Sequence, residues 1–324
     1  MCKLNDIVKC MRYYMAPLEG ITDSIYRRVH HKYFPGADRY YTPFFSPTIH
    51  RALTARESRE LPPADSLDVE VVPQLLTKCA EDFIWMTGVC KALGYGEVNL
   101  NLGCPSGTVT AKGKGSGMLR EPEVLARFLD EIFAGSHLPI SVKTRIGFTE
   151  PEEFYGLLDI YNRYPIAELT VHPRVRKAFY AESVDMEMFR YAEENSKAAL
   201  CYNGNLCTKV QLQQFPQAHP KVGAVMLGRG LIGDPGMLTP GGTTREKLEA
   251  FLGELLEEYS AAFGGSRNAM FRLKENWRYL FCLFQPDSKL QKRFCKATDL
   301  QEYKAVTNEI LHNLPLQNEL SPDW

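Results

Sequence analysis

Short runs of β-forming residues alternate with helical stretches eight times along the first three quarters of the chain. The runs are residues 12–18, 38–44, 70–76, 96–103, 139–145, 167–174, 198–205 and 222–230. Eight strand–helix units at a spacing of roughly 24 to 43 residues are typical of a (β/α)8 TIM barrel, an α/β fold. The alternative is an open doubly wound sheet, which usually has fewer strands. Such a sheet has a Gly-x-Gly-x-x-Gly turn after its first strand, where this chain has Ala-Pro-Leu-Glu-Gly at residues 16–20.

The last quarter of the chain has a different pattern. Residues 239–244 (TPGGTT) are rich in turn-forming residues and are typical of a linker. Beyond them the chain has helical periodicity to about residue 314 and no strand signal. We therefore expect a barrel domain over residues 1–238, a linker over residues 239–246 and a small C-terminal helical bundle over residues 247–324.

The composition is that of an ordinary globular protein. The 324 residues carry a formal net charge of −1, and no apolar run is long enough to span a membrane. The nine cysteines are an odd number and form no Cys-x-x-Cys pair. This favours reduced thiols over a disulfide framework or a zinc site. We expect a cytoplasmic monomer that needs neither a membrane nor a metal ion.

Polar residues gather at the carboxyl ends of six predicted strands. They are Gln74; Asn99, Asn101 and Cys104; Lys143 and Arg145; His172 and Arg174; Asn203, Gly204 and Asn205; and Gly228, Arg229 and Gly230. In a parallel barrel the carboxyl ends of the strands form the active-site face. A single charged side chain there would fit a rim salt bridge. Polar and charged residues at the ends of six strands favour an anionic ligand at the barrel mouth, because unpaired charge is expensive to bury.

The ends of the last two predicted strands fit a phosphate site. Barrels commonly bind phosphate after strands seven and eight, and glycines let backbone amides approach the oxygens. Arg229 would add a positive charge. Two ordinary glycine turns are the structural alternative here. For Cys104, which follows a strand at a bend, the alternative is a buried structural cysteine.

Six motifs occur in order along the predicted barrel. They are residues 15–23 (MAPLEGITD), 101–105 (NLGCP), 142–147 (VKTRIG), 171–174 (VHPR), 202–205 (YNGN) and 225–230 (VMLGRG). These motifs resemble those of the tRNA-dihydrouridine synthase family of bacterial type, over residues 12 to about 238. The resemblance implies an enzyme that binds FMN, takes electrons from NADPH and reduces uridines of tRNA to 5,6-dihydrouridine. His-Pro-Arg at 172–174 and Asn-Gly-Asn at 203–205 depart from the frequent His-Gly-Arg and Asn-Gly-Asp, which leaves the target uridine open.

The resemblance also implies roles for the predicted site residues. Cys104 would give a proton to C5 of uracil, while the flavin supplies a hydride to C6. Lys143 would face the N1–C2=O edge of the flavin, and His172 the flavin or its ribityl chain. The other cofactor residues would hold the ring (Ala16, Pro17, Leu18, Gln74), the ring or the uracil (Asn101), and the phosphate (Asn203, Gly204, Asn205, Gly228, Arg229). Arg145 and Arg174 would contact the RNA, or else form structural ion pairs.

The segment after Cys104 is rich in glycine, with Gly107, Gly113, Gly115 and Gly117. This pattern predicts a mobile loop that closes over a flipped base and carries Cys104 into position. The alternative is a glycine loop that Cys104 merely precedes.

Basic residues are concentrated in the C-terminal segment. Residues 267–296 contain eight Lys or Arg and two acidic residues. Arg267, Lys274 and Arg278 share one helix face, which predicts an RNA-binding surface in a family that needs tRNA. The alternative is a solvated basic face, and the aromatic residues between them are more typical of a helical core.

Two other functions stay open. One is an FMN-barrel reductase of a free pyrimidine, similar to dihydroorotate dehydrogenase, although a small substrate needs no basic helical extension. The other is an RNA-binding or remodelling protein with vestigial chemistry, although Cys104, Lys143 and His172 are all present.

Overall fold

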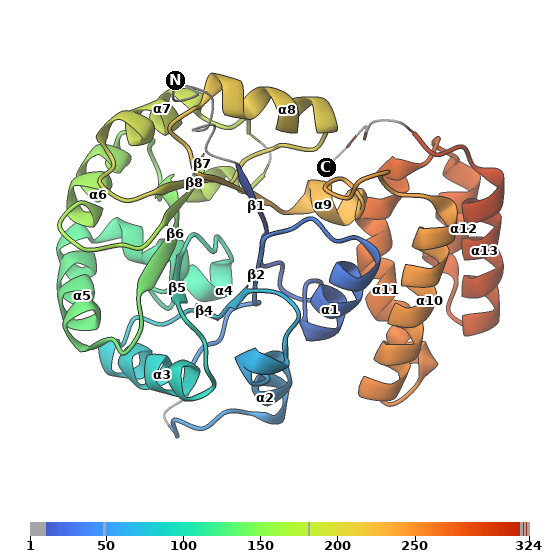
Figure 1. The fold of residues 1–324 in the computed structure, drawn as a ribbon, viewed down its shortest axis with the longest axis horizontal. Helices are drawn as coiled ribbons and strands as arrows, with labels where there is room; N and C mark the ends of the chain where they lie inside the picture. The colour runs from blue at the N-terminus through green and yellow to red at the C-terminus, as the bar shows by residue number, and fades with distance from the viewer. Residues whose placement is uncertain (1–10, 48–49, 181, 318–319, 321, 323–324) are drawn as a thin grey trace, which may run out of the picture.

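The computed structural model describes residues 11–317 except 48–49 and 181, together with residues 320 and 322. Its centre is a parallel nine-stranded sheet in the order β3-β2-β1-β9-β8-β7-β6-β5-β4 (Figure 1). The strands are β1 (Arg12–Met15), β2 (Arg39–Tyr41), β3 (Val71–Val72), β4 (Gln74–Leu75), β5 (Val98–Leu102), β6 (Ile140–Gly147), β7 (Leu169–Val175), β8 (Leu200–Tyr202) and β9 (Ala224–Leu227). All eight predicted strand regions are confirmed, and the fold is the predicted TIM barrel.

The two ends of the sheet order are consecutive in the chain, which closes the barrel. β3 and β4 are separated only by Pro73, whose nitrogen carries no hydrogen for the ladder. The carbonyl of Val72 accepts from the amide of Thr42 at 3.1 Å, and the carbonyl of Pro73 accepts from the amide of Asn99 at 2.8 Å. The single strand predicted over residues 70–76 is therefore two short strands, one paired with β2 and the other with β5.

Helices surround the barrel as an outer layer (Figure 1). They include α1 (Ser24–Tyr33), α3 (Ala80–Ala92), α5 (Pro122–Gly135), α6 (Glu153–Tyr161), α7 (Met186–Asn195) and α8 (Lys209–Ala218), with a shorter α2 (Ala55–Glu60) between β2 and β3. Pro122 occupies the first turn of α5, as its fixed φ allows. α1 is capped by Asp23 and not by the neighbouring Thr22, since the carboxylate of Asp23 accepts from the Tyr26 amide at 2.9 Å. The Thr22 hydroxyl instead accepts from the Leu18 amide at 2.8 Å and so fixes the turn after β1.

Four helices form a bundle after the barrel: α10 (Arg245–Ala262), α11 (Ser266–Leu280), α12 (Ser288–Lys296) and α13 (Leu300–Asn313). α10 begins within the segment predicted as a linker, and the Thr244 hydroxyl caps it. Trp277 is fully buried, and its ring packs near Phe281, Phe284 and Phe294. The aromatic residues of α11 that alternate with its basic residues thus include core residues of the bundle.

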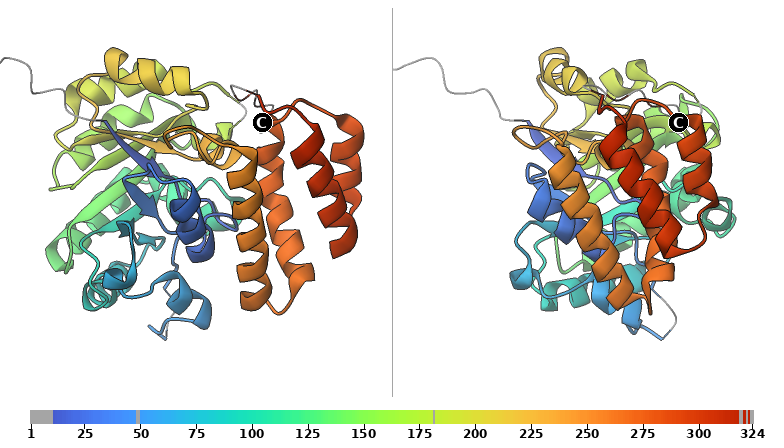
Figure 2. Two further views of the ribbon diagram at one scale, coloured as in Figure 1. Left: turned by 45° about the vertical axis from the view of Figure 1, so that its right-hand side comes forward. Right: turned by 90° about the vertical axis from the view of Figure 1, so that its right-hand side faces the viewer.

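The bundle lies beside the part of the barrel that contains α1 (Figure 2). α10 packs against α1, and α11 packs against the short helix α9 (Arg229–Gly233) that follows β9. Asp23, the N-cap of α1, accepts from Arg272 Nε at 2.9 Å and from the Tyr259 hydroxyl at 3.1 Å. One carboxylate therefore joins the start of α1 to two helices of the bundle.

Three further observations concern the described residues alone. None of their helices combines the length and the apolar character that a membrane crossing requires. No cluster of three or more His, Cys, Asp or Glu side chains could hold a metal ion. Cys104 is partly exposed, and no disulfide joins the cysteines between residues 79 and 295.

Candidate active site

A cavity of about 260 Å³ opens at the carboxyl ends of the strands. Its lining comes from the ends of β4, β5, β6 and β7, from segments that follow β1, β2, β5 and β7, and from one residue of the C-terminal bundle. The lining residues predicted from the sequence are Pro17, Leu18, Gln74, Asn101, Cys104, Lys143, Arg145 and His172. The closed barrel thus brings to one place residues that lie far apart in the chain.

A smaller cavity of about 70 Å³ shares Pro17, Leu18, Lys143 and His172 with the larger one. The rest of its predicted lining is Ala16, Asn203, Gly204, Asn205, Gly228 and Arg229. At Gly204 an added Cβ would lie 2.0 Å from the Tyr202 hydroxyl, so a side chain cannot be accommodated there without a shift. Every residue predicted to bind the cofactor therefore lines one of two adjoining cavities, and their individual roles stay predictions.

The cavities are rich in cations. Burial, and next the nearby Arg145 guanidinium, lower the pKa of Lys143 to about 8. Arg229 lies in the smaller cavity, where its Nη2 donates to Asn205 Oδ1 at 2.9 Å. Burial lowers the pKa of Arg229 as well. Of the residues that line the larger cavity only Glu19 is acidic, and it is paired with Arg56 of α2. The site is therefore suited to an anionic ligand.

His172 is neutral in this setting. Burial, and next the cations Arg145 and Lys143, hold its pKa well below the usual range. Arg174 Nη1 lies 2.9 Å from His172 Nε2. Because a guanidinium only donates, Nε2 must accept, and the ring proton is on Nδ1. Arg174 also donates to the carbonyl of Glu182 at 2.6 Å. The contact with RNA predicted for Arg174 stays a prediction, since its side chain here is buried and sets the tautomer of His172.

Arg145 is also buried and joins the segment after β5 to the end of β7 and the loop that follows it. Its guanidinium donates to the carbonyls of Gly103 at 3.0 Å, Val175 at 2.9 Å and Phe179 at 3.0 Å. The structural alternative for Arg145 was an ion pair, but its partners are backbone carbonyls. Contact with a nucleotide that enters the cavity stays a prediction, because Arg145 lies in the cavity wall.

Asn101 fixes the backbone that carries Cys104. Its Oδ1 accepts from the amides of Gly103 at 3.0 Å and Cys104 at 2.9 Å. Its Nδ2 donates to Gln74 Oε1 at 2.7 Å, and Gln74 Nε2 donates to Asn99 Oδ1 at 2.8 Å. Asn99 Nδ2 in turn donates to Ser141 Oγ at 2.9 Å. This chain of side chains crosses β4, β5 and β6, so the orientation of the Asn101 amide is set by buried partners.

The thiol of Cys104 keeps its proton at neutral pH. Burial raises its pKa, although the nearby amide of Ser106 and the cations Arg145 and Lys143 act in the opposite direction. The carbonyl of Cys104 accepts from Ser116 Oγ at 2.8 Å. Cys104 is therefore a protonated thiol on a held turn in the cavity wall.

The glycine-rich segment after Cys104 is folded. It forms α4 (Gly107–Thr110) and a short 3-10 helix over Gly115–Arg120, and residues 115–119 are buried. Arg176 Nε donates to the carbonyl of Pro105 at 3.1 Å, and Arg120 Nη2 to that of Thr110 at 3.1 Å. Backbone carbonyls of the segment are therefore bound by Arg120 of its own 3-10 helix and by Arg176, which follows β7, and the predicted mobility stays a prediction. Closure of this segment over a base stays a prediction.

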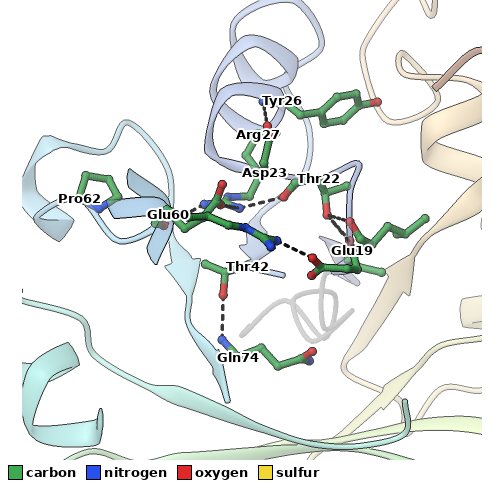
Figure 3. A network of polar contacts seen from close by, with 12 residues as sticks. Glu19, Thr22, Asp23, Tyr26, Arg27, Thr42, Glu60, Pro62 and Gln74 are labelled. Atoms are coloured by element: carbon green, nitrogen blue, oxygen red, sulfur yellow. Dashed lines mark hydrogen bonds and ion pairs between the residues drawn. The ribbon is translucent and has the colours of Figure 1, made fainter. Parts of the chain in front are cut away.

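The turn between β1 and α1 is held by a separate polar network (Figure 3). Arg27 Nη1 donates to the carbonyl of Thr22 at 2.8 Å and to Glu60 Oε2 at 3.1 Å. The Thr42 hydroxyl accepts from the Gln74 amide at 2.9 Å, at the break between β3 and β4. Glu60 is the last residue of α2, so this outer segment supports the turn that carries Pro17 and Leu18.

Sequence reasoning missed three aromatic residues of the larger cavity, Phe44, Tyr180 and Tyr279. Tyr180 is half-exposed in the loop after β7, and its ring lies 4.6 Å from the Arg229 guanidinium and 5.9 Å from the His172 ring. The one available signal was an aromatic pair, Phe179-Tyr180, in a loop at the active-site end of a strand. Tyr279 belongs to α11, so the bundle contributes to the cavity wall, which no local pattern indicates.

The basic residues of the bundle are used in different ways. Arg267 and Arg278 are exposed on α11. Lys274 is half-buried, and its Nζ donates to the carbonyls of Cys295 and Ala297 at 2.8 Å each, which neutralises the end of α12. In this structure Lys274 thus holds two helices together, and RNA binding by Arg267, Lys274 and Arg278 stays a prediction.

Comparisons with known proteins agree with this geometry. The family model described as dihydrouridine synthase matches residues 14–306. A similar protein is the tRNA-dihydrouridine(16) synthase of Shigella flexneri, 26% identical over 311 residues, with 92% of this chain and 95% of that protein covered. A probable tRNA-dihydrouridine synthase of Staphylococcus aureus strain COL is 24% identical over 315 residues, with 92% of each chain covered.

Among solved structures, a mutant of morphinone reductase in complex with tetrahydroNAD has the same barrel fold. Its TM-score is 0.51 at 12% identity, with 70% of this chain and 85% of that chain covered. The family model spans nearly the whole described chain and includes both cavities and most of the bundle. The chain therefore belongs to the dihydrouridine synthase family.

Proposed function

We propose that this protein reduces a uridine of tRNA to 5,6-dihydrouridine, with FMN as cofactor and NADPH as electron donor. The observation that carries the proposal is the placement of the Cys104 thiol and the Lys143 ammonium in the wall of one cavity. In the proposed reaction these two groups would supply the proton donor and the positive charge beside the flavin ring and the uracil. The family membership and the names of the relatives support the same reaction.

The residues that line the two cavities suit FMN in their charge and their hydrogen-bonding groups. The larger one would take the ring system, with Lys143 opposing the negative charge that reduction places on its N1–C2=O edge. The smaller one would take the phosphate, since Arg229 and the backbone at Gly204 and Gly228 line it. His172 would donate from Nδ1. When bound and reduced, FMN supplies the hydride that adds to C6 of uracil.

The protein's own part of the chemistry is proton delivery. Cys104 Sγ–H gives its proton to C5 of uracil on the side that faces the thiol, and the thiolate regains a proton from solvent. A thiol with a pKa at or above the ordinary value of about 8.5 holds its proton at neutral pH, and a positioned acid of this kind contributes about 10²–10⁴ in rate. Asn101 acts as a positioning residue, since it holds the amides of Gly103 and Cys104.

For the RNA we propose a path across both parts of the chain, a barrel over residues 1–238 and an RNA-binding bundle over residues 247–324, linked by residues 239–246. Tyr279 of α11 lines the cavity, so an RNA that reaches the cavity would lie beside the bundle. Unstacking the uridine costs a few kcal/mol, and contacts with the bundle would offset this. We further propose that the protein acts in the cytoplasm as a monomer.

Reversal of charge at the exposed Arg267 and Arg278 is expected to weaken tRNA binding. Removal of one phosphate-binding cation should lower the slope of log K against log salt by roughly 0.7 to 0.9, while the FMN content stays unchanged. Arg267→Glu and Arg278→Glu are compared in binding titrations from about 50 to about 200 mM salt, an interval over which phosphate binding weakens steeply. Lys304→Glu on α13 is the control. Equal slopes for all three variants would mean that Arg267 and Arg278 form a solvated basic face of α11 that does not bind RNA.

The reaction itself is tested by mass spectrometry of nucleosides. Unmodified tRNA is incubated with the purified protein, FMN and NADPH, and the expected product is uridine with two added hydrogens. Free uracil and orotate are tested in parallel, because their reduction without RNA would favour a free-pyrimidine reductase instead. A protein that binds tRNA but holds no flavin would point to RNA binding with vestigial chemistry.

A further inference from the structure

Phe179 has a backbone conformation that a bulky residue rarely adopts. It follows the 3-10 helix over Arg176–Ala178 with φ 46° and ψ −98°. Among the described residues only Arg51 and Phe179 combine a positive φ with a side chain. Glycine is the usual residue in such a conformation, because a Cβ crowds the neighbouring carbonyl. A phenylalanine at this position makes the folded state less stable than a glycine would, unless a contact of its ring offsets the backbone strain.

The backbone turn at Phe179 positions a carbonyl group, and this role does not involve the side chain. The turn points the carbonyl of Phe179 at Arg145 Nη2, 3.0 Å away. Arg145 also holds Gly103 and Val175, which follow or end β5 and β7. A glycine would allow the same hydrogen bond without the strain, so the active-site geometry does not explain a phenylalanine here.

Packing does not explain the ring either. The residue is 44% exposed, and its ring lies 5.2 Å from the Arg176 guanidinium. An exposed ring gains little from burial. The structure thus places a partly exposed aromatic ring in a strained position, where its contact is with the Arg176 guanidinium.

The position of the ring indicates what it meets. Tyr180, the next residue, lines both cavities, whereas Phe179 lines neither. Phe179 therefore lies at the rim, outside the space that the reacting base would occupy. The Arg176 guanidinium lies behind its ring, and the neighbouring Lys177 is exposed and paired with Glu150. An aromatic face backed by positive charge is the arrangement that binds a nucleobase and its phosphate in single-stranded RNA.

We propose that Phe179 is a stacking platform for the nucleotide next to the uridine that enters the cavity. This inference rests on the proposed function, in which an RNA base reaches the cavity. Stacking on the platform would hold the flanking base in an unstacked RNA segment while the target uridine enters. Strain in the free protein is then the consequence of an exposed ring that is preorganised for RNA.

The test compares Phe179→Gly, Phe179→Ala and Phe179→Trp with the unchanged protein. Loss of a base–aromatic stack typically weakens binding by about 5- to 150-fold, so Phe179→Gly and Phe179→Ala should raise the Kd for unmodified tRNA by a factor in this range. Phe179→Trp should retain binding. NADPH oxidation without RNA and FMN content should be unchanged, and the melting temperature of Phe179→Gly should be equal or higher. Tyr155→Ala, which removes an exposed ring on α6, is the control.

The identity of the partner is tested with modified RNA. Once the reduced uridine has been mapped, a transcript with an abasic site beside it should bind the unchanged protein and Phe179→Gly equally. Equal binding of both proteins to intact tRNA, or a lower melting temperature of Phe179→Gly, would overturn the inference. Binding is measured separately from turnover. If the unchanged protein forms no dihydrouridine and Phe179→Gly still weakens binding, the proposed reaction fails while the stacking platform stands.

Discussion

Cys104→Ala is expected to lower the rate of dihydrouridine formation in tRNA by about 10²–10⁴, the usual contribution of a positioned general acid. The variant loses the proton donor to C5 but keeps every residue that lines the smaller cavity. It should therefore bind FMN and oxidise NADPH like the unchanged protein. Flavin reduction is followed as NADPH oxidation without RNA. Reduction of the uridine is followed by nucleoside mass spectrometry and by a single-turnover assay of flavin reoxidation by tRNA.

Cys79→Ala is the matched control, since it removes an exposed thiol outside both cavities. The pH dependence gives an independent check. Because burial raises the pKa of the Cys104 thiol, turnover should decline only above the ordinary thiol pKa of about 8.5, where the acid becomes a thiolate. Near-normal reduction of tRNA by Cys104→Ala would remove Cys104 from the mechanism.

Lys143→Met is expected to weaken FMN binding and to slow flavin reduction by NADPH by about 10²–10³, the usual cost of removing one preorganised charge. In the free protein the pKa of Lys143 is lowered to about 8, whereas a lysine in water stays charged up to about 10.4. An anionic ligand favours the ammonium, so above pH 8 FMN binding must be accompanied by proton uptake. The affinity for FMN should therefore fall as the pH rises through about 8.

Titration of the flavin-free protein with FMN between pH 6.5 and 9.5, followed by quenching of flavin fluorescence, measures this dependence. In Lys143→Met the step near pH 8 should disappear, and the affinity below it should be lower than in the unchanged protein. Lys177→Met is the control, because its exposed ammonium is paired with Glu150 outside the cavities. A step that persists in Lys143→Met would assign the titration to another group.

The barrel could be predicted because each strand and helix has its own local pattern. The carboxyl ends of parallel strands meet by construction, so residues such as Gln74 and His172 converge in the structure as the motif order predicts. The break at Pro73 could not be placed from the pattern, since a run of apolar residues on both sides of a proline also fits one edge strand.

What the sequence could not indicate are contacts between distant segments. The three carbonyls that Arg145 holds belong to Gly103, Val175 and Phe179, and only the closed barrel brings them together. Lys274 looked like a surface cation because its carbonyl partners lie on another helix. The glycine-rich segment gave no sign of its own contacts for the same reason, since Arg176, which binds the carbonyl of Pro105, lies 71 residues further along the chain.

The carboxylate of Asp23 has a consequence for the order in which the chain is made. It caps α1 near the start of the chain, but Arg272, its cationic partner, is 249 residues further along. A nascent chain that has completed its barrel strands therefore presents an uncompensated anion and the rings of Tyr26 and Phe34, which the finished protein packs against Phe251 of α10. The barrel of a growing chain therefore exposes the surface of α1 that carries Asp23, Tyr26 and Phe34. This surface is covered only after the last quarter of the protein has left the ribosome.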